Sequence, residues 1–577
     1  MKRWMKYVKP YLKSFILGPL GMIVEVIGEM FMPLVLAMII NDGEAGTLTV
    51  GSSIGYAAIL ALIAVLMMAG GVCGAYFGSK ASVNFAADLR SDVYSKIQKY
   101  SFANIDKFSA SSLVTRMTND VTQLQNFVNM LLRMALRSPG MFIGGIIMAV
   151  MLKPSLSVVL AVTMPMMLVV IGLLIRLGFP RFERLQKKVD KLNATVRENV
   201  TNVRVVKSFV REDYEINKFE TDNADLKKSG MNAVKIMIYM GPVMNLFMYA
   251  TVIAIIWLGH GEVLNFGMPV GDLSAFVTYT TQILSSLMMV TMLLMTSSRA
   301  MASAKRISEV LDEVPDIQDL ENANYERKIE AGNIEFKNVS FRYYKNSEEA
   351  VLENIDLTIP AGSTVGIIGS TGCGKTTLVS MIPRLYDVDE GEVLVDGVNV
   401  KDYSLVSLRD GIGMVLQKNL LFAGSIADNL RWGDMEASDE EMKKMARYAA
   451  ADKFVSTFND GYDTELDKGG TNLSGGQKQR LCIARALLKK PKILILDDST
   501  SAVDTATEAQ IREAFRSEIP DCTKIIIAQR ISSVKDADSI IVMNDGKITG
   551  IGTHDELLKN NAEYGEIYYS QMDKKEA

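Results

Sequence analysis

The sequence predicts two large units in series, an α-helical domain that crosses a membrane six times and a following α/β domain. Two observations lead to this fold class. Hydrophobic residues make up 49% of the 577-residue chain, and the long apolar runs lie mostly in its first half. Beyond that half, short β-like runs alternate with glycines and helical stretches, which is typical of an α/β domain.

Domain boundaries follow from the same change in pattern. We expect the membrane domain over residues 1–315, a linker over 316–332 and the α/β domain over 333–577. The net charge of -4 is small, and no polybasic tail or Cys/His cluster indicates nucleic acid or a structural metal. The four cysteines have no CxxC spacing, so no disulfide framework is expected either.

Six apolar stretches are long enough to form membrane-spanning helices, since a helix needs about 20 residues to cross a bilayer. They are Ser14–Ile40, Ile54–Phe77, Ser138–Leu152 with a preceding helical run, Ser155–Leu177, Ile236–Leu258 and Leu273–Met295. Two long connections, 78–137 and 178–235, are charged yet helical in pattern. We therefore expect them to extend the helices beyond the bilayer.

Lysine and arginine residues indicate the orientation, because positive residues are retained on the cytoplasmic side of a membrane. Those ahead of the first span are Lys2, Arg3, Lys6, Lys9 and Lys13. The connections 41–53 and 259–272 contain neither lysine nor arginine. We therefore expect a multi-pass protein in the lipid bilayer of the cell membrane, with its amino terminus and α/β domain in the cytoplasm.

Two acidic residues interrupt the first apolar run. Glu25 and Glu29 are four residues apart, so they share one helix face. One interpretation is recognition of a cationic substrate, and the other is a solvated pair near the membrane surface. Methionine is abundant, with 35 copies, and suits either a surface for varied apolar ligands or ordinary packing and lipid contact.

A phosphate-binding loop follows the apolar run 363–368. Its residues form a complete Walker A sequence, Gly369, Ser370, Thr371, Gly372, Cys373, Gly374, Lys375 and Thr376, and Thr377 begins a helical run to Arg384. In this strand–loop–helix order the glycines let backbone N–H groups surround phosphates at a helix N-terminus. We expect Lys375 to neutralise the β and γ phosphates and Thr376 to bind Mg²⁺, so ATP and Mg²⁺ are the expected cofactors.

A second apolar run, 493–496, ends in Asp497, which gives the Walker B pattern of a carboxylate aimed at Mg²⁺ from the end of a strand. Upstream lies the signature sequence of ABC ATPases, Leu473, Ser474, Gly475, Gly476 and Gln477. With these motifs the whole chain resembles a half-transporter of the ABC exporter family. The resemblance implies a membrane domain of the type I, or type IV, ABC exporter fold, fused ahead of an α/β P-loop ABC ATPase domain.

The resemblance implies roles for three further residues of the nucleotide site. Tyr343, in a Phe-Arg-Tyr sequence, is similar to the aromatic residue that stacks on adenine. Gln417, in Val-Leu-Gln, is similar to the Q-loop glutamine that contacts Mg²⁺ and the membrane domain. Asp504 ends the segment 501–504, which resembles the D-loop that runs between two sites.

Two segments of the membrane domain, 102–121 and 198–215, resemble those that carry the coupling helices of the family. Candidate coupling residues are Asp106–Ser109 and Ser208–Arg211. The alternative is that these charged stretches are only solvated helix faces. Their positions match the family pattern, which favours the coupling role.

Two catalytic positions depart from that pattern. Directly after Asp497 the family has a glutamate that polarises the attacking water, but this chain has Asp498, which is one methylene shorter. After the strand 524–528 the family has a histidine that bridges this glutamate and the γ-phosphate, but this chain has Gln529. Since a positioned general base is worth about 10² to 10⁴ in rate, we expect this site to bind ATP and hydrolyse it slowly. A sluggish but working site is the alternative.

The intact signature completes the prediction. In this family two ATPs are held between two ATPase domains, each by the Walker motifs of one chain and the signature of the other. We therefore expect a heterodimer in which a non-identical half-transporter hydrolyses ATP and this chain supplies the signature. The expected function is ATP-driven export of amphipathic or hydrophobic compounds such as drugs. Lipid or peptide export, siderophore import and ATP gating of a pore by a regulatory subunit are the alternatives.

Overall fold

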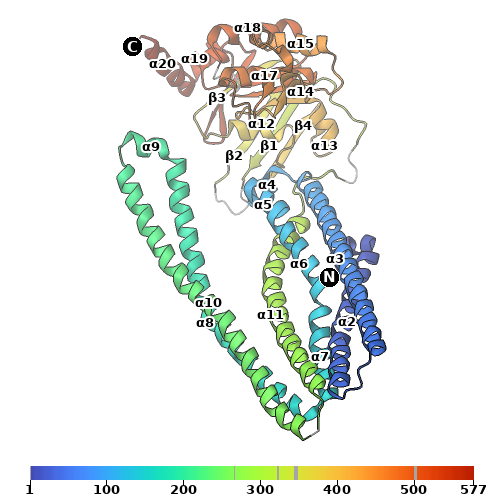
Figure 1. Ribbon diagram of the computed structural model, residues 1–577. Helices are drawn as coiled ribbons and strands as arrows, with labels where there is room; N and C mark the ends of the chain where they lie inside the picture. The colour runs from blue at the N-terminus through green and yellow to red at the C-terminus, as the bar shows by residue number, and fades with distance from the viewer. Residues whose placement is uncertain (1, 266, 321–323, 344–348, 499–502, 577) are drawn as a thin grey trace. The chain divides into compact units, whose positions relative to one another are not determined.

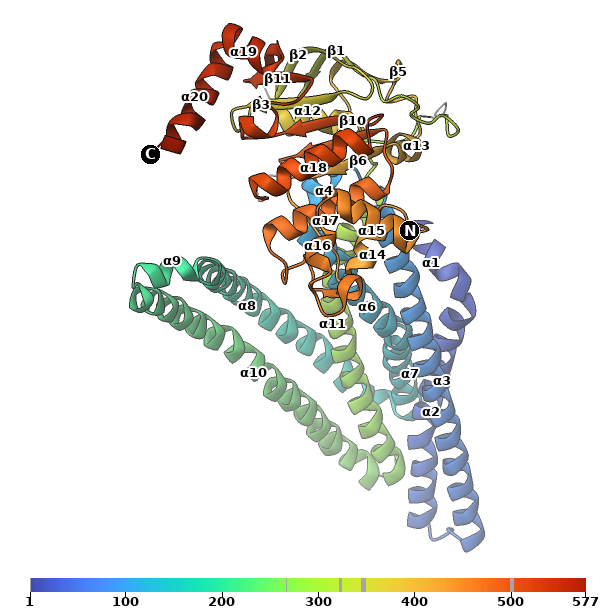
Figure 2. The same cartoon turned by 90° about the horizontal axis from the view of Figure 1, so that it is seen from above.

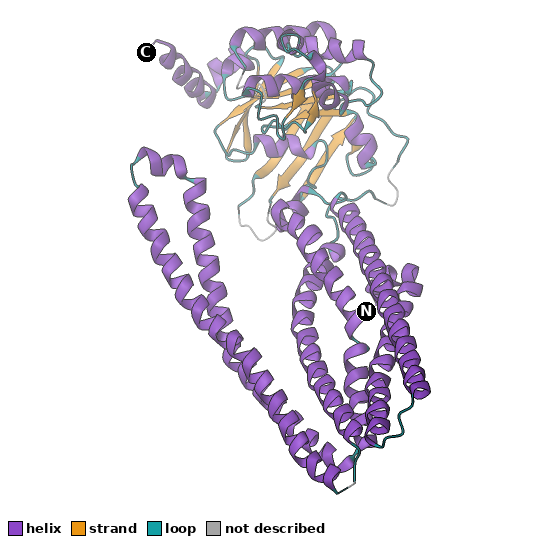
Figure 3. Cartoon of the chain, in the orientation of Figure 1, coloured by secondary structure: helices purple, strands orange, loops and turns teal. Residues whose placement is uncertain are grey.

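The computed structural model describes residues 2–265, 267–320, 324–343, 349–498 and 503–576 (Figure 1). It divides the chain into a helical unit, Met1–Ile97 and Ser111–Asp312, and an α/β unit, Gln98–Ala110 and Glu313–Ala577. Throughout the described residues, strands occur only in the α/β unit (Figure 3). The boundaries 1–315 and 333–577 stay a prediction, and the structure adds that residues 98–110 pack with the second unit.

The helical unit consists of long helices joined by shorter ones. They are α1 Lys2–Val8, α2 Leu12–Glu44, α3 Val50–Ile97, α5 Ala110–Thr115, α6 Val121–Met134, α7 Arg137–Leu152, α8 Pro154–Thr201, α9 Val203–Ser208, α10 Glu212–Leu264 and α11 Val270–Asp312. A 3-10 turn, Lys9–Tyr11, precedes α2, and a π-helix, Arg116–Asp120, joins α5 to α6. Within the described ranges, six helical runs are long and apolar enough to cross a membrane, which confirms the six predicted spans.

Close packing of α2 on α3 depends on small residues. A Cβ atom at Gly21 would lie 2.6 Å from the carbonyl oxygen of Gly70 and 2.8 Å from the backbone nitrogen of Gly74. Such glycines allow two membrane helices to approach closely. Elsewhere in this unit α8 runs along α10, and the pair separates from the other helices towards α9 (Figures 1 and 2). We call this pair, Pro154–Leu264, the α8–α10 arm.

The α/β unit contains the strands. They are β1 Ile334–Phe341, β2 Leu352–Ile359, β3 Thr364–Gly369, β4 Glu390–Val395, β5 Val398–Asn399, β6 Ile412–Val415, β7 Gly424–Ser425, β8 Glu465–Leu466, β9 Ile493–Asp497, β10 Thr523–Ile527, β11 Ser539–Asn544 and β12 Lys547–Gly552. Its helices are α4 Phe102–Phe108, α12 Lys375–Met381, α13 Leu405–Asp410, α14 Ile426–Arg431, α15 Asp439–Tyr448, α16 Asp452–Val455, α17 Gly475–Leu488, α18 Thr505–Glu518, α19 His554–Asn560 and α20 Ala562–Glu576, with 3-10 turns at Gly461–Asp463 and Ile531–Ser533.

The larger sheet of the described chain has six strands in the order β12-β11-β3-β10-β9-β6. All neighbours except β12 and β11 pair in parallel. A smaller antiparallel sheet has the order β2-β1-β4-β5. The residues of β9 and β10 are buried throughout, which explains their continuous apolar runs, since parallel sheets are covered on both faces.

Candidate functional site

Four neighbouring strands of the parallel sheet end at one edge. In the order β3, β10, β9 and β6, their carboxyl ends lead into the Walker A loop, Gln529, Asp497 and Gln417. The register pairs Asp497 with Ile527, and the backbone N–H of Asp498 donates to the carbonyl oxygen of Ile527 at 3.0 Å. Parallel pairing therefore places four separate segments of the chain at one site.

The Walker A loop curls around its own lysine. Gly372 and Gly374 have φ angles of 89° and 97°, a left-handed conformation that glycine adopts without strain. The Lys375 Nζ donates to the carbonyl oxygens of Gly369 at 2.8 Å and Ser370 at 2.7 Å. Its positive charge therefore lies inside the loop, where phosphates would bind. The other loop residues follow the same turn, with Thr371 exposed and Cys373 buried.

The helix after the loop differs from the prediction in its bounds. The sequence predicts a helix over 377–384, but α12 begins at Lys375 and ends at Met381. It begins earlier because Gly374 caps it and turns the chain directly into the helix. Beyond its end, Arg384 has a left-handed φ of 51°, so the helical conformation does not extend to that residue.

Thr376 and Asp497 form a pair of oxygen donors. The Thr376 hydroxyl donates to the Asp497 carboxylate, whose two oxygens lie 3.0 and 2.9 Å away. Asp497 is only 2% exposed, and this burial raises the pKa of its carboxyl group. The described residues include no cluster of three or more His, Cys, Asp or Glu side chains that could hold a metal. One carboxylate and one hydroxyl fit Mg²⁺, which usually binds few protein oxygens together with phosphates and water.

Asp498 and Gln529 are in direct contact. The Gln529 Nε2 donates to the Asp498 Oδ2 at 2.9 Å, and the Gln417 side chain also hydrogen-bonds to Asp498. Partial burial raises the pKa of Asp498, although Gln417 and the charge of Lys375 act in the opposite direction. Two glutamine side chains therefore engage the carboxylate that takes the place of the expected base.

Tyr343 lies just beyond β1 and is held from two directions. Its hydroxyl is 2.9 Å from the Thr377 Oγ1 on α12. Its ring lies nearly perpendicular to those of Phe341, at a centroid distance of 5.0 Å, and Tyr386, at 5.2 Å. The side chain stays 45% exposed, so part of this anchored ring is accessible to a ligand. Sequence reasoning missed Tyr386, because no nucleotide motif contains it.

The signature sequence forms the N-terminus of α17. Ser474 caps this helix through a reciprocal arrangement with Gln477, in which the Ser474 N–H donates to the Gln477 Oε1 at 2.9 Å. Gly475 and Gly476 complete the first turn, and Leu473 is buried in the hydrophobic core. Backbone N–H groups at such a helix end favour anions.

The predicted D-loop is described only in part, because residues 501 and 502 lie outside the described residues. Asp504 is the N-cap of α18. It accepts hydrogen bonds from the backbone N–H of Thr507 at 2.9 Å and from its hydroxyl at 2.7 Å, and these bonds lower the pKa of Asp504. The end of this segment is therefore rigidly attached to α18.

Glu25 and Glu29 on α2 have a partner that sequence reasoning missed. The Arg137 guanidinium on α7 lies 3.1 Å from the Glu25 Oε1 and 2.7 Å from the Glu29 Oε1. Gln282 on α11 donates to the backbone carbonyl of Glu29 at 3.3 Å. The second carboxylate oxygens of both glutamates are buried without a hydrogen-bond partner. Two acidic side chains and one basic side chain therefore meet inside the helical unit.

Comparisons with known proteins agree with this architecture. Residues 15–287 match the family described as "ABC transporter transmembrane region", and residues 352–501 match the family "ABC transporter". The chain is 37% identical to the ABC transporter ATP-binding protein YfiB of Bacillus subtilis, with 99% of each chain covered. It is 38% identical to an ABC transporter ATP-binding protein of Mycobacterium tuberculosis, with 98% and 97% covered.

The fold is also that of a solved structure. A bacterial Atm1-family ABC exporter with ATP bound superimposes with a TM-score of 0.76 at 24% identity, covering 98% of both chains. This likeness concerns the fold, in which membrane helices and an ATPase domain share one polypeptide. With matching family models in both units and relatives over nearly its full length, the chain belongs to the ABC transporters, as a half-transporter whose membrane domain is fused to its ATPase domain.

Proposed function

We propose that this chain is one half of a heterodimeric ATP-driven exporter, and that its own nucleotide site retains ATP while the partner's site turns over. The contact between Asp498 and Gln529 carries the proposal. An amide neither accepts a proton nor carries charge near neutral pH, so Gln529 offers no proton path to its neighbour. The residues for phosphate and Mg²⁺, in contrast, keep the family pattern.

The shortened carboxylate supports slow hydrolysis on geometric grounds. A general base must come within about 3 Å of the water proton that it removes. Asp498 is one methylene shorter than the family's glutamate, and its carboxylate is engaged by Gln529 and Gln417. Lys375, Thr376 and Asp497 bind phosphate and Mg²⁺ without requiring a base, so affinity is expected to survive.

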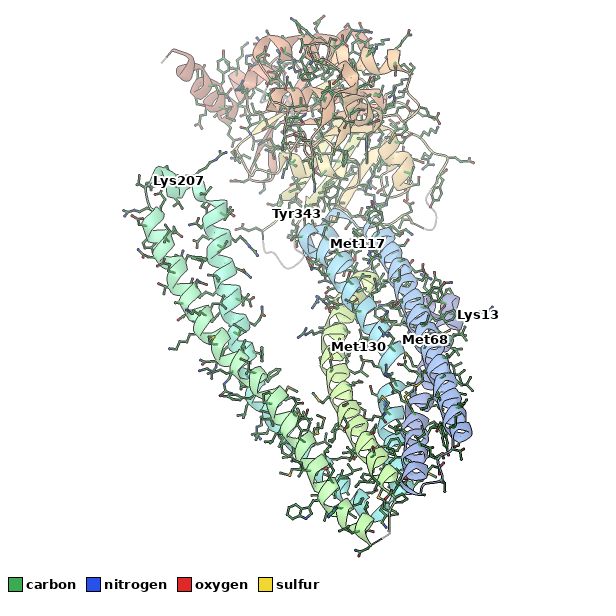
Figure 4. The ribbon with its side chains drawn as sticks, viewed as in Figure 1. Lys13, Met68, Met117, Met130, Lys207 and Tyr343 are labelled. Carbon is green, nitrogen blue, oxygen red and sulfur yellow. The ribbon has the colours of Figure 1, made fainter. Side chains whose placement is uncertain are left out.

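The second of the two predicted coupling helices supports the presence of a second chain. The first, α4, packs within the α/β unit, where the buried Asn104 donates to the Glu313 Oε1 at 3.1 Å. The second, α9, which includes Lys207, lies at the end of the α8–α10 arm (Figure 4). There Phe209 is 71% exposed and Val210 79% exposed. Adjacent exposed apolar side chains are typical of a protein-binding surface, and we assign this one to the partner's ATPase domain.

The charges of the helical unit suggest the substrate and the orientation. Because Glu25 and Glu29 share the single guanidinium of Arg137, their charge balance favours an amphipathic compound with a cationic group. The lysines and arginines of the amino-terminal segment support a cytoplasmic location for this end and for the ATPase domain. Because a cytoplasmic ATPase domain fits import as well as export, the outward direction is proposed from the likeness to the exporter fold alone.

The proposal is tested with the chain reconstituted in proteoliposomes, alone and with a non-identical half-transporter. We expect slow phosphate release from the chain alone, and ATP-dependent transport of a cationic amphipathic dye by the pair. Replacing the partner's catalytic glutamate should reduce turnover about 10²- to 10⁴-fold, whereas Asp498→Ala should have little effect. Full family rates from the chain alone, abolished by Asp498→Ala, would overturn the proposal.

A further inference from the structure

Tyr386 lies between the nucleotide site and the first predicted coupling helix. It follows α12 in the sequence and packs against the core formed by β1 and its neighbours. Its ring contacts Tyr343 at a centroid distance of 5.2 Å, in an almost perpendicular arrangement, and Phe341 at 5.6 Å. On another side, the ring of Phe102 from α4 lies 6.3 Å away. These distances are within the range of aromatic pairs that stabilise one another.

The contacts of Tyr386 fix the orientation of Tyr343. A ring anchored only by its hydroxyl could still rotate about that bond. Tyr343 has the hydroxyl contact to Thr377 and, in addition, the edge-to-face contacts to Phe341 and Tyr386. Thr377 directly follows the predicted Mg²⁺ ligand Thr376. The hydroxyl contact of Tyr343 with Thr377 therefore connects the ring expected to stack on adenine to the phosphate-binding loop.

On its side towards Phe102, Tyr386 contacts α4, and α4 is attached to the segment 313–316. Asn104 is 1% exposed, and its Oδ1 accepts a hydrogen bond from the backbone N–H of Asp316 at 3.3 Å. Lys107 forms an ion pair with Glu313 at 2.8 Å. Burial raises the pKa of Tyr386 to about 12, with further contributions from Tyr343 and from Asp106 on α4, which agrees with its place between the two. A change in the ring of Tyr343 can thus reach α4 through one side chain.

We propose that Tyr386 is a positioning residue that holds Tyr343 against the base of the nucleotide and transmits occupation of this site to α4 through Phe102. This inference rests on the proposed role of Tyr343 as the adenine platform. It means that an ATP retained at this site changes the position or environment of α4 in the same chain. Binding of the adenine base, rather than of the phosphates, would cause this change in α4, the chain's own predicted coupling helix.

The first test compares two ligands that share phosphates but not the base. The affinities of the full-length chain for Mg²⁺·ATP and Mg²⁺·tripolyphosphate are measured by calorimetry. We expect Tyr386→Leu to weaken ATP binding about 2- to 10-fold, in line with the strength of aromatic pairs, and to leave tripolyphosphate binding unchanged. Tyr386→Phe keeps the ring and should behave as the parent chain. Equal weakening of both ligands, or an unchanged ATP affinity, would overturn the inference.

Tyr343→Leu separates this inference from the proposed function. If Tyr343→Leu also fails to weaken the binding of ATP relative to tripolyphosphate, the proposed role of Tyr343 in stacking on adenine is wrong. If Tyr343→Leu weakens the binding of ATP selectively while Tyr386→Leu does not, only the proposed role of Tyr386 is wrong.

The second test measures the response of α4 to nucleotide by fluorescence. A fluorophore is attached at Ile105→Cys after Cys73, which is exposed, is replaced by serine; the other three cysteines are buried. We expect ATP, but not tripolyphosphate, to change the emission. Phe102→Ala should abolish this change while the chain still binds ATP. A response that persists in Phe102→Ala would show that α4 is reached by another route and would contradict the proposed transmission.

Discussion

The phosphate-binding half of the nucleotide site and its water-activating half lie on the same edge of one sheet, yet they are equipped differently. Lys375, Thr376 and Asp497, the residues expected to hold phosphate and Mg²⁺, lie together at this edge with a positive charge and two oxygen ligands. Asp498 and Gln529, only one position beyond Asp497 and one strand away, form an amide–carboxylate contact instead of a base and a histidine. From this difference we expect affinity and turnover to depend on separate side chains, so that either can change without the other.

The largest effect is expected from restoring the water-activating half. In the double variant Asp498→Glu with Gln529→His, we expect ATP hydrolysis by the purified chain to rise by about 10²-fold or more, because a positioned general base returns. The chain carries its own intact signature, so a homodimer of this variant would contain complete sites. Phosphate release measures the gain, and Lys375→Ala in the same background should remove it. An unchanged rate would mean that another step limits hydrolysis. It would contradict the assignment of slow turnover to Asp498 and Gln529.

A smaller effect is expected from removing the charge of the phosphate-binding half. Lys375→Ala should weaken Mg²⁺·ATP binding about 10- to 100-fold, because hydrogen bonds to charged groups contribute about 1.5–3 kcal/mol. Asp498→Ala is the matched control, since it removes a carboxyl group from the same edge, and it should leave the affinity nearly unchanged. Equilibrium binding of a fluorescent ATP analogue measures both. A comparable loss in the two variants would contradict the separation of affinity from turnover.

The smallest effect concerns the signature, which we propose acts in the partner's site and not in this chain's own. Ser474→Ala removes the N-cap of α17 and should destabilise the ATPase domain by about 1 kcal/mol, or about 2–4 °C in its thermal midpoint. The chain's own affinity for ATP should not change, whereas turnover in the pair should fall. Calorimetry and phosphate release measure the two outcomes. If Ser474→Ala weakened ATP binding by the isolated chain, the signature would act in this chain's own site.

Contiguous patterns allowed much of the fold and the nucleotide site to be predicted. The six spans depend on the length of apolar runs, which is a local property, and the structure confirms them. The Walker A loop is likewise one unbroken segment with a strand before it and a helix after it. The start of α12 was misplaced by two residues, because the sequence pattern does not reveal that Gly374 already has the cap conformation.

The sequence by itself determined the fold class, the family resemblance and the two positions, Asp498 and Gln529, that depart from the family pattern, because each is read from neighbouring residues. Only the tertiary structure decided which distant side chains meet. Arg137 lies 108 positions from Glu29, in a stretch that reads as part of a charged connection, yet helix packing pairs the two. Tyr386 and Phe102 likewise come from separate segments that no motif links. Ion pairs and ring contacts of this kind depend on how helices and sheets pack, and local periodicity does not contain that information.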